Sequence, residues 1–148
     1  MASTVYTSGL AKCNGMATAA NFLTDTWKSY LVISTYVPNV DHDFFSDVTE
    51  IGAVSGYTPG YNSVSHPTLT SKTIAVDDTL NKITYDAADV SFGSPATGAT
   101  IGGWAIYKPV TVGTDSPVLV FVDATDTPTN GAALTGVFDV LGMLTIQN

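Results

Sequence analysis

One short stretch holds the densest group of metal-capable side chains in the sequence: Asp41, His42, Asp43 and Asp47. Calcium prefers carboxylate oxygens, and an EF-hand loop needs Gly at its sixth position and a bidentate acid at its twelfth. Counted from Asp41, those positions hold Ser46 and Gly52, so the spacing excludes this loop. The stretch instead predicts a single helical turn from Asp43 to Val48, with Asp41 as its N-cap.

Only His42 and His66 could supply the imidazole of a serine–histidine–aspartate triad, because the chain has no other histidine. The sequence contains no Gly-x-Ser-x-Gly elbow. His66 precedes Pro67 in a serine-rich loop, where the backbone favours extended conformations. We therefore predict that His66 is a solvent-exposed loop residue and not a general base.

Two carboxylate pairs, Asp77 with Asp78 and Asp86 with Asp89, have the residue types that glycosidases use. Both pairs lie at turns between predicted strands, where aspartate commonly accepts hydrogen bonds from the backbone. The turn role is our prediction. An activity that disappears on mutation of Asp43 or Asp86 would indicate an enzyme, such as a glycosidase, instead.

Two further stretches have weaker binding features. Asp123, Asp126 and Asn130 could surround a cation in a loop, although a polar turn explains the same residues. The stretch Gly98–Gly103 does not match a phosphate-binding loop or a dinucleotide fingerprint, so its glycines predict a bend into a strand at Trp104. We predict no catalytic residue, no cofactor and no bound metal.

Charge is sparse and strongly acidic. The 148 residues include five lysines, no arginine and thirteen acidic residues, and only 12% are charged, against about 25% in an average protein. Nucleic acids and anionic membranes are bound through Lys and Arg, so a net charge of −8 argues against both partners. A surface of hydroxyls and amides carries little charge repulsion, which favours extended contacts with neighbouring subunits.

The single cysteine, Cys13, excludes an internal disulfide and is predicted to be a small, partly buried apolar residue. Lys12 and Asn14 interrupt the only apolar run near the start, which argues against a signal peptide. The longest strongly apolar stretch, Val118–Val122, is too short to span a bilayer. We expect a soluble protein.

β-Branched and aromatic residues dominate, and Pro and Gly interrupt the sequence at short intervals, which is typical of strands. The predicted strands are Trp27–Tyr36, Leu69–Asp77, Leu80–Tyr85, Val90–Phe92, Trp104–Lys108, Pro117–Val122 and one or two within Val137–Ile146. In the first of these, apolar residues alternate onto both faces, so we expect both to be partly covered. Asp78 and Thr79 predict a hairpin turn between the second and third strands.

The fold predicted from these strands is all-β: a single antiparallel β-sandwich, of the jelly-roll or immunoglobulin-like type, with about eight strands. One domain is expected to cover residues 1–148. Helix is expected only in Leu10–Phe22 and in the short turn from Asp43 to Val48.

Short segments occur along the chain in a recognisable order: Val5-Tyr6, Gly9-Leu10-Ala11-Lys12, Asp25-Thr26-Trp27-Lys28, Thr35-Tyr36-Val37-Pro38, Asp43-Phe44, Asp47-Val48, Val54-Ser55-Gly56-Tyr57-Thr58, Leu69-Thr70-Ser71-Lys72-Thr73, Asp86-Ala87-Ala88-Asp89-Val90, Phe92, Ala105-Ile106-Tyr107-Lys108 and Ser116-Pro117 before Val118–Asp123. In this order the chain resembles a family of small structural proteins from the virion gene clusters of tailed bacteriophages. The resemblance covers nearly the whole chain, but its segments are strand and turn motifs without a chemical signature.

The resemblance implies a head decoration or accessory virion protein, whose partners are the major capsid protein and further copies of the chain, with a homotrimer as one arrangement. Packaged DNA would repel so acidic a chain, so we expect it on the outer surface of the head. The N-terminal segment 1–22 and the loop Asn39–Tyr61 are the predicted contact regions. The alternative is a tail or fibre-associated module that binds the host surface through exposed aromatics such as Tyr57, Tyr61 and Trp104.

Overall fold

Nine strands and one short 3-10 helix make up the regular structure in the computed structural model, which describes residues 4–6, 20–139 and 141–147. In chain order the elements are β1 (Thr4–Val5), β2 (Lys28–Ile33), η1 (Phe45–Asp47), β3 (Thr73–Asp77), β4 (Lys82–Asp86), β5 (Val90–Ser91), β6 (Thr100–Tyr107), β7 (Val118–Pro128), β8 (Thr135–Gly136) and β9 (Leu144–Gln147). All the strand pairings are antiparallel, so the predicted all-β class is confirmed.

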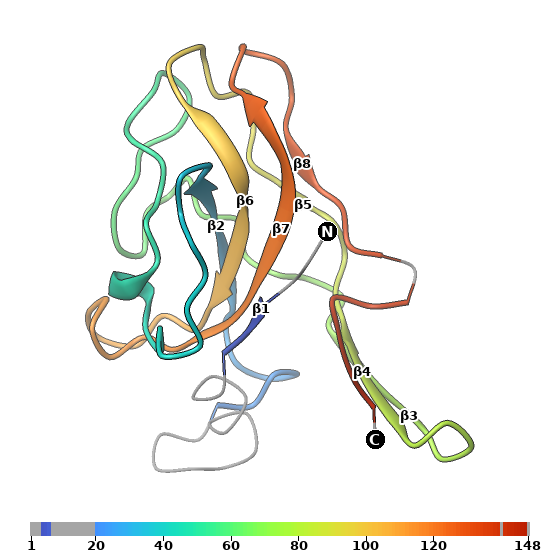
Figure 1. Cartoon of the computed structure of the whole chain (residues 1–148). Coiled ribbons are helices and arrows are strands. Elements are labelled where there is room, and N and C mark those ends of the chain that lie inside the picture. Colours follow the sequence, from blue (N-terminus) through green and yellow to red (C-terminus); the bar gives the residue numbers. More distant parts are fainter. Residues whose placement is uncertain (1–3, 7–19, 140, 148) are drawn as a thin grey trace.

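β6 and β7 form the centre of a four-stranded sheet with the order β1-β7-β6-β2. Figure 1 shows them as two long, curved strands in the middle of the body. Every residue of β6 after Thr100 is buried, and so are the first four residues of β7. Such continuous burial requires other parts of the chain to cover both faces of the sheet.

The two faces carry different cores. Trp27, Leu31 and Ile106 belong to a largely aliphatic cluster on one side. The opposite side holds a second group, here called the tyrosine cluster: Tyr6, Tyr30, Val32, Val48, Ala105, Tyr107, Val118 and Phe121. Neighbouring residues of β2 alternate between the two groups, as the two-residue period of a strand requires. The prediction that both faces of this strand are covered is therefore confirmed.

A separate three-stranded sheet, here called the arm, has the order β3-β4-β9. In Figure 1 it projects away from the four-stranded sheet, with the turn between β3 and β4 at its tip. Residues directly opposite each other share a face, and the rows on one face are Ile74-Tyr85-Leu144 and Val76-Ile83-Ile146. Tyr85 and Leu144 are buried against the body, whereas Val76 is 65% exposed. One apolar face thus begins in the core and continues into solvent.

β5 and β8 form a short two-stranded sheet, with Val90 opposite Gly136. A Cβ atom on Gly136 would lie 3.0 Å from the indole of Trp104 and 3.0 Å from the side chain of Val90. The absence of a side chain at this position allows β8 to approach the aliphatic cluster closely.

The predicted strands are present with shifted ends. The predicted hairpin is confirmed, but its turn has four residues and contains Leu80, because the carboxylate of Asp77 accepts the backbone N–H groups of Thr79 and Leu80. β7 continues to Pro128, six residues beyond its predicted end, because it pairs there with the start of β6. The short strand β1 was not predicted. The strands group into three sheets, and the jelly-roll or immunoglobulin-like sandwich stays a prediction.

The predicted helices have different outcomes. The turn from Asp43 to Val48 is confirmed as η1. Most of the predicted helix Leu10–Phe22 falls on residues 7–19, outside the described residues, as does Cys13. The described helical structure includes no helix long and apolar enough to cross a membrane.

The described parts of the two predicted contact regions lie partly in the protein's own core. In segment 1–22, Tyr6, Ala20 and Phe22 are buried within the chain. In the loop Asn39–Tyr61, Val48 and Ile51 are buried as well. These residues pack internally because the sheet needs cover on both faces, and the subunit contacts of the two regions stay a prediction.

Candidate functional site

His66 lies at the centre of a buried polar network, and the prediction of an exposed loop histidine is wrong. Its side chain is 2% exposed. The Nδ1 atom lies 2.9 Å from the hydroxyl of Tyr107 on β6, and the Nε2 atom lies 2.6 Å from a carboxylate oxygen of Glu50. The loop that precedes Pro67 turns this imidazole inward over the sheet because partners for both nitrogens are present there.

Glu50 is the hub of the network, and the sequence analysis missed it. Its Oε1 atom also accepts the hydroxyl of Tyr57 at 2.7 Å, and its Oε2 atom accepts the backbone N–H of Gly60 at 2.8 Å. The hydroxyl of Tyr57 in turn accepts the backbone N–H of Leu31 at 3.1 Å. A single glutamate between the apolar residues Val48 and Ile51 was the available signal.

The hydrogen bonds of this network fix a loop in place. Both ring nitrogens of His66 are engaged, and neither bonds to a serine hydroxyl. Burial raises the pKa of the Tyr57 and Tyr107 hydroxyls, so these groups remain protonated donors across the physiological range. The arrangement ties the loop containing Glu50, Tyr57 and His66 to the central sheet.

The acidic group at 41–47 caps a turn, but not through the predicted residue. The carboxylate of Asp47 accepts the backbone N–H groups of Asp43 and Phe44 at 3.0 and 2.9 Å, so the predicted capping by Asp41 is wrong. His42 instead bonds through Nδ1 to the hydroxyl of Tyr36 at 2.8 Å. Among the residues that the structure describes, no group of three or more His, Cys, Asp or Glu could hold a metal ion.

The turn role predicted for the paired carboxylates is confirmed for Asp77 and Asp86, whereas Asp89 bonds a segment forty-nine positions later in the chain. Asp77 caps the hairpin turn, Asp86 accepts the backbone N–H of Ala87 at 2.8 Å, and Asp89 accepts that of Phe138 at 2.9 Å. These carboxylates are used to order loops.

The loop predicted around Asp123 is wrong. Asp123 and Asp126 lie on β7, and Asn130, beyond the end of that strand, accepts the backbone N–H of Ala132. The structure therefore does not gather the three side chains into a turn. The predicted bend is confirmed at Gly98, which lies in a bend just before β6. Gly102 and Gly103 lie inside β6, where the pairing with β7 shifts register between Ile101 and Gly103.

The proposed aromatic platform does not form. Tyr57 and Trp104 are only 1% and 8% exposed. The half-buried Tyr61 packs against the ring of Phe45, with 5.7 Å between ring centroids, and accepts the hydroxyl of Ser116. These three residues are packing residues, so they offer no surface on which a sugar can stack.

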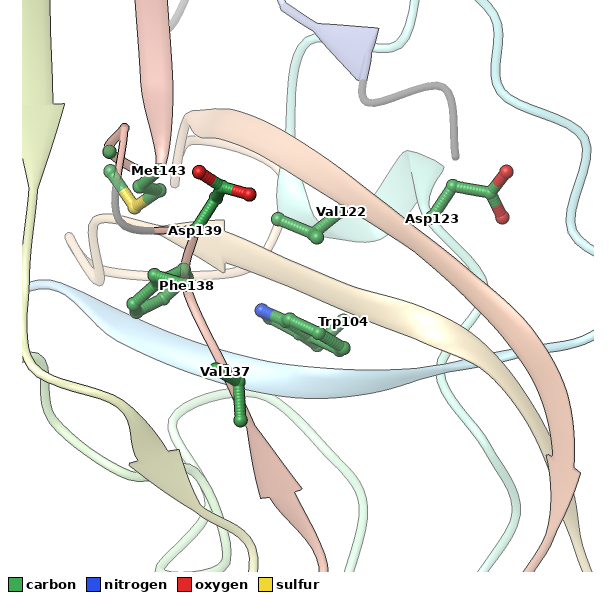
Figure 2. Close-up of a pocket in the computed structure, with 8 residues that line it drawn as sticks. Trp104, Val122, Asp123, Val137, Phe138, Asp139 and Met143 are labelled. Atoms are coloured by element: carbon green, nitrogen blue, oxygen red, sulfur yellow. The ribbon is translucent and has the colours of Figure 1, made fainter.

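A cavity of about 510 Å³ lies beside Trp104, between β6, β7 and the segment that precedes β9. Figure 2 shows Phe138 beside the nitrogen end of the Trp104 indole, with Asp139 and Met143 beyond it and Asp123 at the opposite end. The remaining lining residues are Val122, Val137 and Gly142. The indole N–H is buried and has no hydrogen-bond partner in the described part of the chain.

The size and lining of this cavity suit a small ligand, because binding sites are commonly 300 to 1,000 Å³ and mostly apolar. The charged groups at its wall are the carboxylates of Asp123 and Asp139. Asp139 also accepts the backbone N–H of Leu141 at 2.8 Å, which keeps this carboxylate in place. Two carboxylates and no cationic side chain line the described wall, so the cavity is suited to holding an uncharged or cationic group.

No protein-family model, curated protein or solved structure matches this chain.

Proposed function

We propose that this chain is a non-enzymatic structural subunit of a tailed-bacteriophage virion, where it decorates the outer surface of the head by bridging major capsid subunits. The observation that carries the proposal is the arm, a projecting sheet whose apolar face is not covered by the described residues. Ile74, Val76, Ile83 and Ile146 are between 36% and 65% exposed on that face.

The arm supports an assembly role because exposed aliphatic side chains that share one face mark interaction sites. These four side chains are neighbours in the cross-strand rows of one sheet and are not scattered over the surface. A shell repeats each small contact many times, so modest interfaces combine into high overall stability.

The engagement of the polar side chains supports a structural role. His66, Glu50, Asp47, Asp77 and Asp89 all bond to the backbone or to each other. They hold loops and turns in fixed conformations, which is what a subunit with a fixed outer surface requires.

The charge of the chain supports an exterior position. With a net charge of −8 and no arginine, it cannot gain the counterion release that favours proteins lining packaged DNA. Residues 125–128 at the far end of β7 are exposed, so antibodies against 125–130 should label intact, DNA-filled particles. Protection of this epitope until the shell is opened would contradict the exterior position.

Quantitative mass spectrometry of purified virions tests the proposal. We expect hundreds of copies per particle, as for a protein that covers a head lattice. A handful of copies would assign the chain to the neck or tail, and its absence from virions would overturn the proposal.

The alternative is a tail or fibre-associated module that binds the host surface, and the cavity beside Trp104 is the observation that favours it. In that case Asp123→Ala, which changes the cavity wall, should weaken binding of the purified protein to host cells. Asp126→Ala on the same strand lies outside the cavity and is the matched control. Equal binding by both variants and the unchanged protein would remove this alternative.

A further inference from the structure

The outer edge of the arm is an open strand. β3 pairs with β4 on one side only, and no described residue pairs with it on the other side. The strand Thr73–Asp77 contains no proline and no lysine, which are common devices that protect sheet edges from pairing with another chain.

The backbone groups on this edge can be assigned. The carbonyl of Tyr85 accepts the backbone N–H of Met143 at 2.9 Å, so Tyr85 directs its backbone groups toward β9 and away from β3. Ile74, which lies opposite Tyr85, is therefore in a non-hydrogen-bonded pair. The N–H and C=O groups of Ile74 and Val76 consequently point out of the edge, whereas those of Ala75 point toward β4.

This edge is complementary to itself. If two β3 strands pair antiparallel about a twofold axis at Ala75, Ile74 of each copy lies opposite Val76 of the other. Both residues then form hydrogen-bonded pairs, each of which exchanges two backbone bonds. Thr73 lies opposite Asp77 on the polar face, so like charges do not meet there.

Other registers fit less well. A shift by one residue places apolar side chains opposite polar ones, because the side-chain period of a strand is two. An axis at Val76 places Ile74 opposite Asp78. With the axis at Ala75, position 72 of one copy instead lies opposite Asp78 of the other, so no like charges meet at the ends of the pairing.

We propose that the β3 edge of the arm binds the same edge of a second copy of this chain, which joins the two arms into one continuous six-stranded antiparallel sheet. The contact is isologous, with the same residues on both copies, and it closes at two. This contact between copies deepens the proposed role of the chain as an assembly subunit. Only the biological setting of the contact, a virion, rests on that proposed function. The exposed aliphatic side chains of the two arms then lie on one continuous face.

The pairing is weak in isolation. A stable interface buries roughly 800 Å² per partner, and one five-residue edge buries less. We therefore expect the pair to form at roughly 10 to 100 µM and to dissociate on dilution.

Sedimentation of the purified full chain tests this inference. The unchanged protein should shift from 15.4 kDa toward twice that mass as its concentration rises. Val76→Pro removes one outward N–H without touching the bonds to β4, so it should stay monomeric. The matched control Val76→Thr keeps the N–H and should associate like the unchanged protein.

Amide hydrogen exchange of the unchanged protein gives a second test that needs no variant. The amides of Ile74 and Val76 should exchange at least tenfold more slowly at high than at low concentration, whereas the amide of Ala75 should be protected at both. Equal rates at both concentrations, a closed trimer, or undiminished pairing of Val76→Pro would overturn the inference. Virion mass spectrometry is independent of these results, so each proposal can fail alone.

Discussion

Both ring nitrogens of His66 are committed to hydrogen bonds inside the protein. We expect His66→Ala to lower the free energy of unfolding by about 3 kcal/mol, because it leaves Glu50 and Tyr107 without their buried partner and opens a cavity. Urea denaturation followed by fluorescence measures the change. The control is His42→Ala, which removes the half-buried histidine that bonds Tyr36 and should cost less than about 1 kcal/mol. Equal losses would show that the network does not hold the fold.

The buried tyrosines should resist ionisation. Burial raises the pKa of Tyr6, Tyr30, Tyr57 and Tyr107 above the ordinary value of 10.0. Because the folded pKa exceeds the unfolded one, this stabilisation is complete below pH 10 and is lost as the pH rises toward the folded pKa. The tyrosinate absorbance of these residues should therefore appear only as the chain unfolds, in a cooperative step with the loss of circular dichroism. Their reversible titration near pH 10 in the folded protein would contradict this prediction.

For individual residues, the sequence predicted the roles of the turn aspartates but not the burial of the histidine. Asp77 and Asp86 act on backbone groups near them at strand ends, and residue type indicates such roles. His66 is buried because Glu50, sixteen positions earlier, and Tyr107, forty-one positions later, converge on it. Local composition cannot reveal partners that only the tertiary fold brings together.

β6 and β7 lie very close together at Gly103. A Cβ atom there would lie 2.1 Å from the carbonyl oxygen of Val122 and 2.9 Å from the ring of Phe121. We expect Gly103→Ala to destabilise the protein by about 3 kcal/mol or more, because the backbone of β7 would have to move. The control is Gly52→Ala, since nothing lies within 4 Å of its added methyl group. Thermal unfolding of both variants measures the difference, and equal midpoints would show that the two strands can separate without cost.

Element types were predicted better than element ends. The alternation in β2 and the hairpin of β3 and β4 are encoded in neighbouring residues, and both are confirmed. The length of β7 depends on its pairing with the start of β6, and β1 exists only because Thr4 and Val5 meet Phe121 and Val120. Pairings between distant segments leave little signal in the segments themselves.

An ion pair connects several parts of the whole molecule. The Nζ atom of Lys108, just beyond β6, lies 2.6 Å from a carboxylate oxygen of Asp25, just before β2, and Lys72 bonds the backbone carbonyl of Asp25 from the base of the arm. The hydrogen bond from Lys108 holds the pKa of Asp25 below its ordinary value. The ion pair therefore stabilises the fold above the unfolded pKa, about 3.9, and this contribution is lost as the pH falls through the lower, folded pKa.

We expect Asp25→Asn to reduce stability at pH 7 by less than about 1 kcal/mol, because the pair is partly exposed. The difference from the unchanged protein should shrink as the pH falls below the folded pKa, which urea titrations at pH 7 and near pH 2 would show. Asp126→Asn, at the exposed end of β7, is the control and should change little at either pH. A difference that stays constant with pH would rule out the charge as its source.

The pairing of strands that are distant along the chain determines the order in which the sheets can form during synthesis. β2 pairs with β6 some seventy residues later, and β1 pairs with β7 at a separation of more than a hundred, so the central sheet cannot close until most of the chain has left the ribosome. The hairpin of β3 and β4 can form from neighbouring residues much earlier, but the third strand of the arm, β9, is translated only after β8. Until β9 emerges, the nascent arm has two open edges instead of one, and the inner edge of β4 is then free to pair with neighbouring nascent chains. Translation of Leu144–Gln147 therefore covers the β4 edge and leaves β3 as the open edge of the arm. A chain truncated before Leu144 should aggregate during expression.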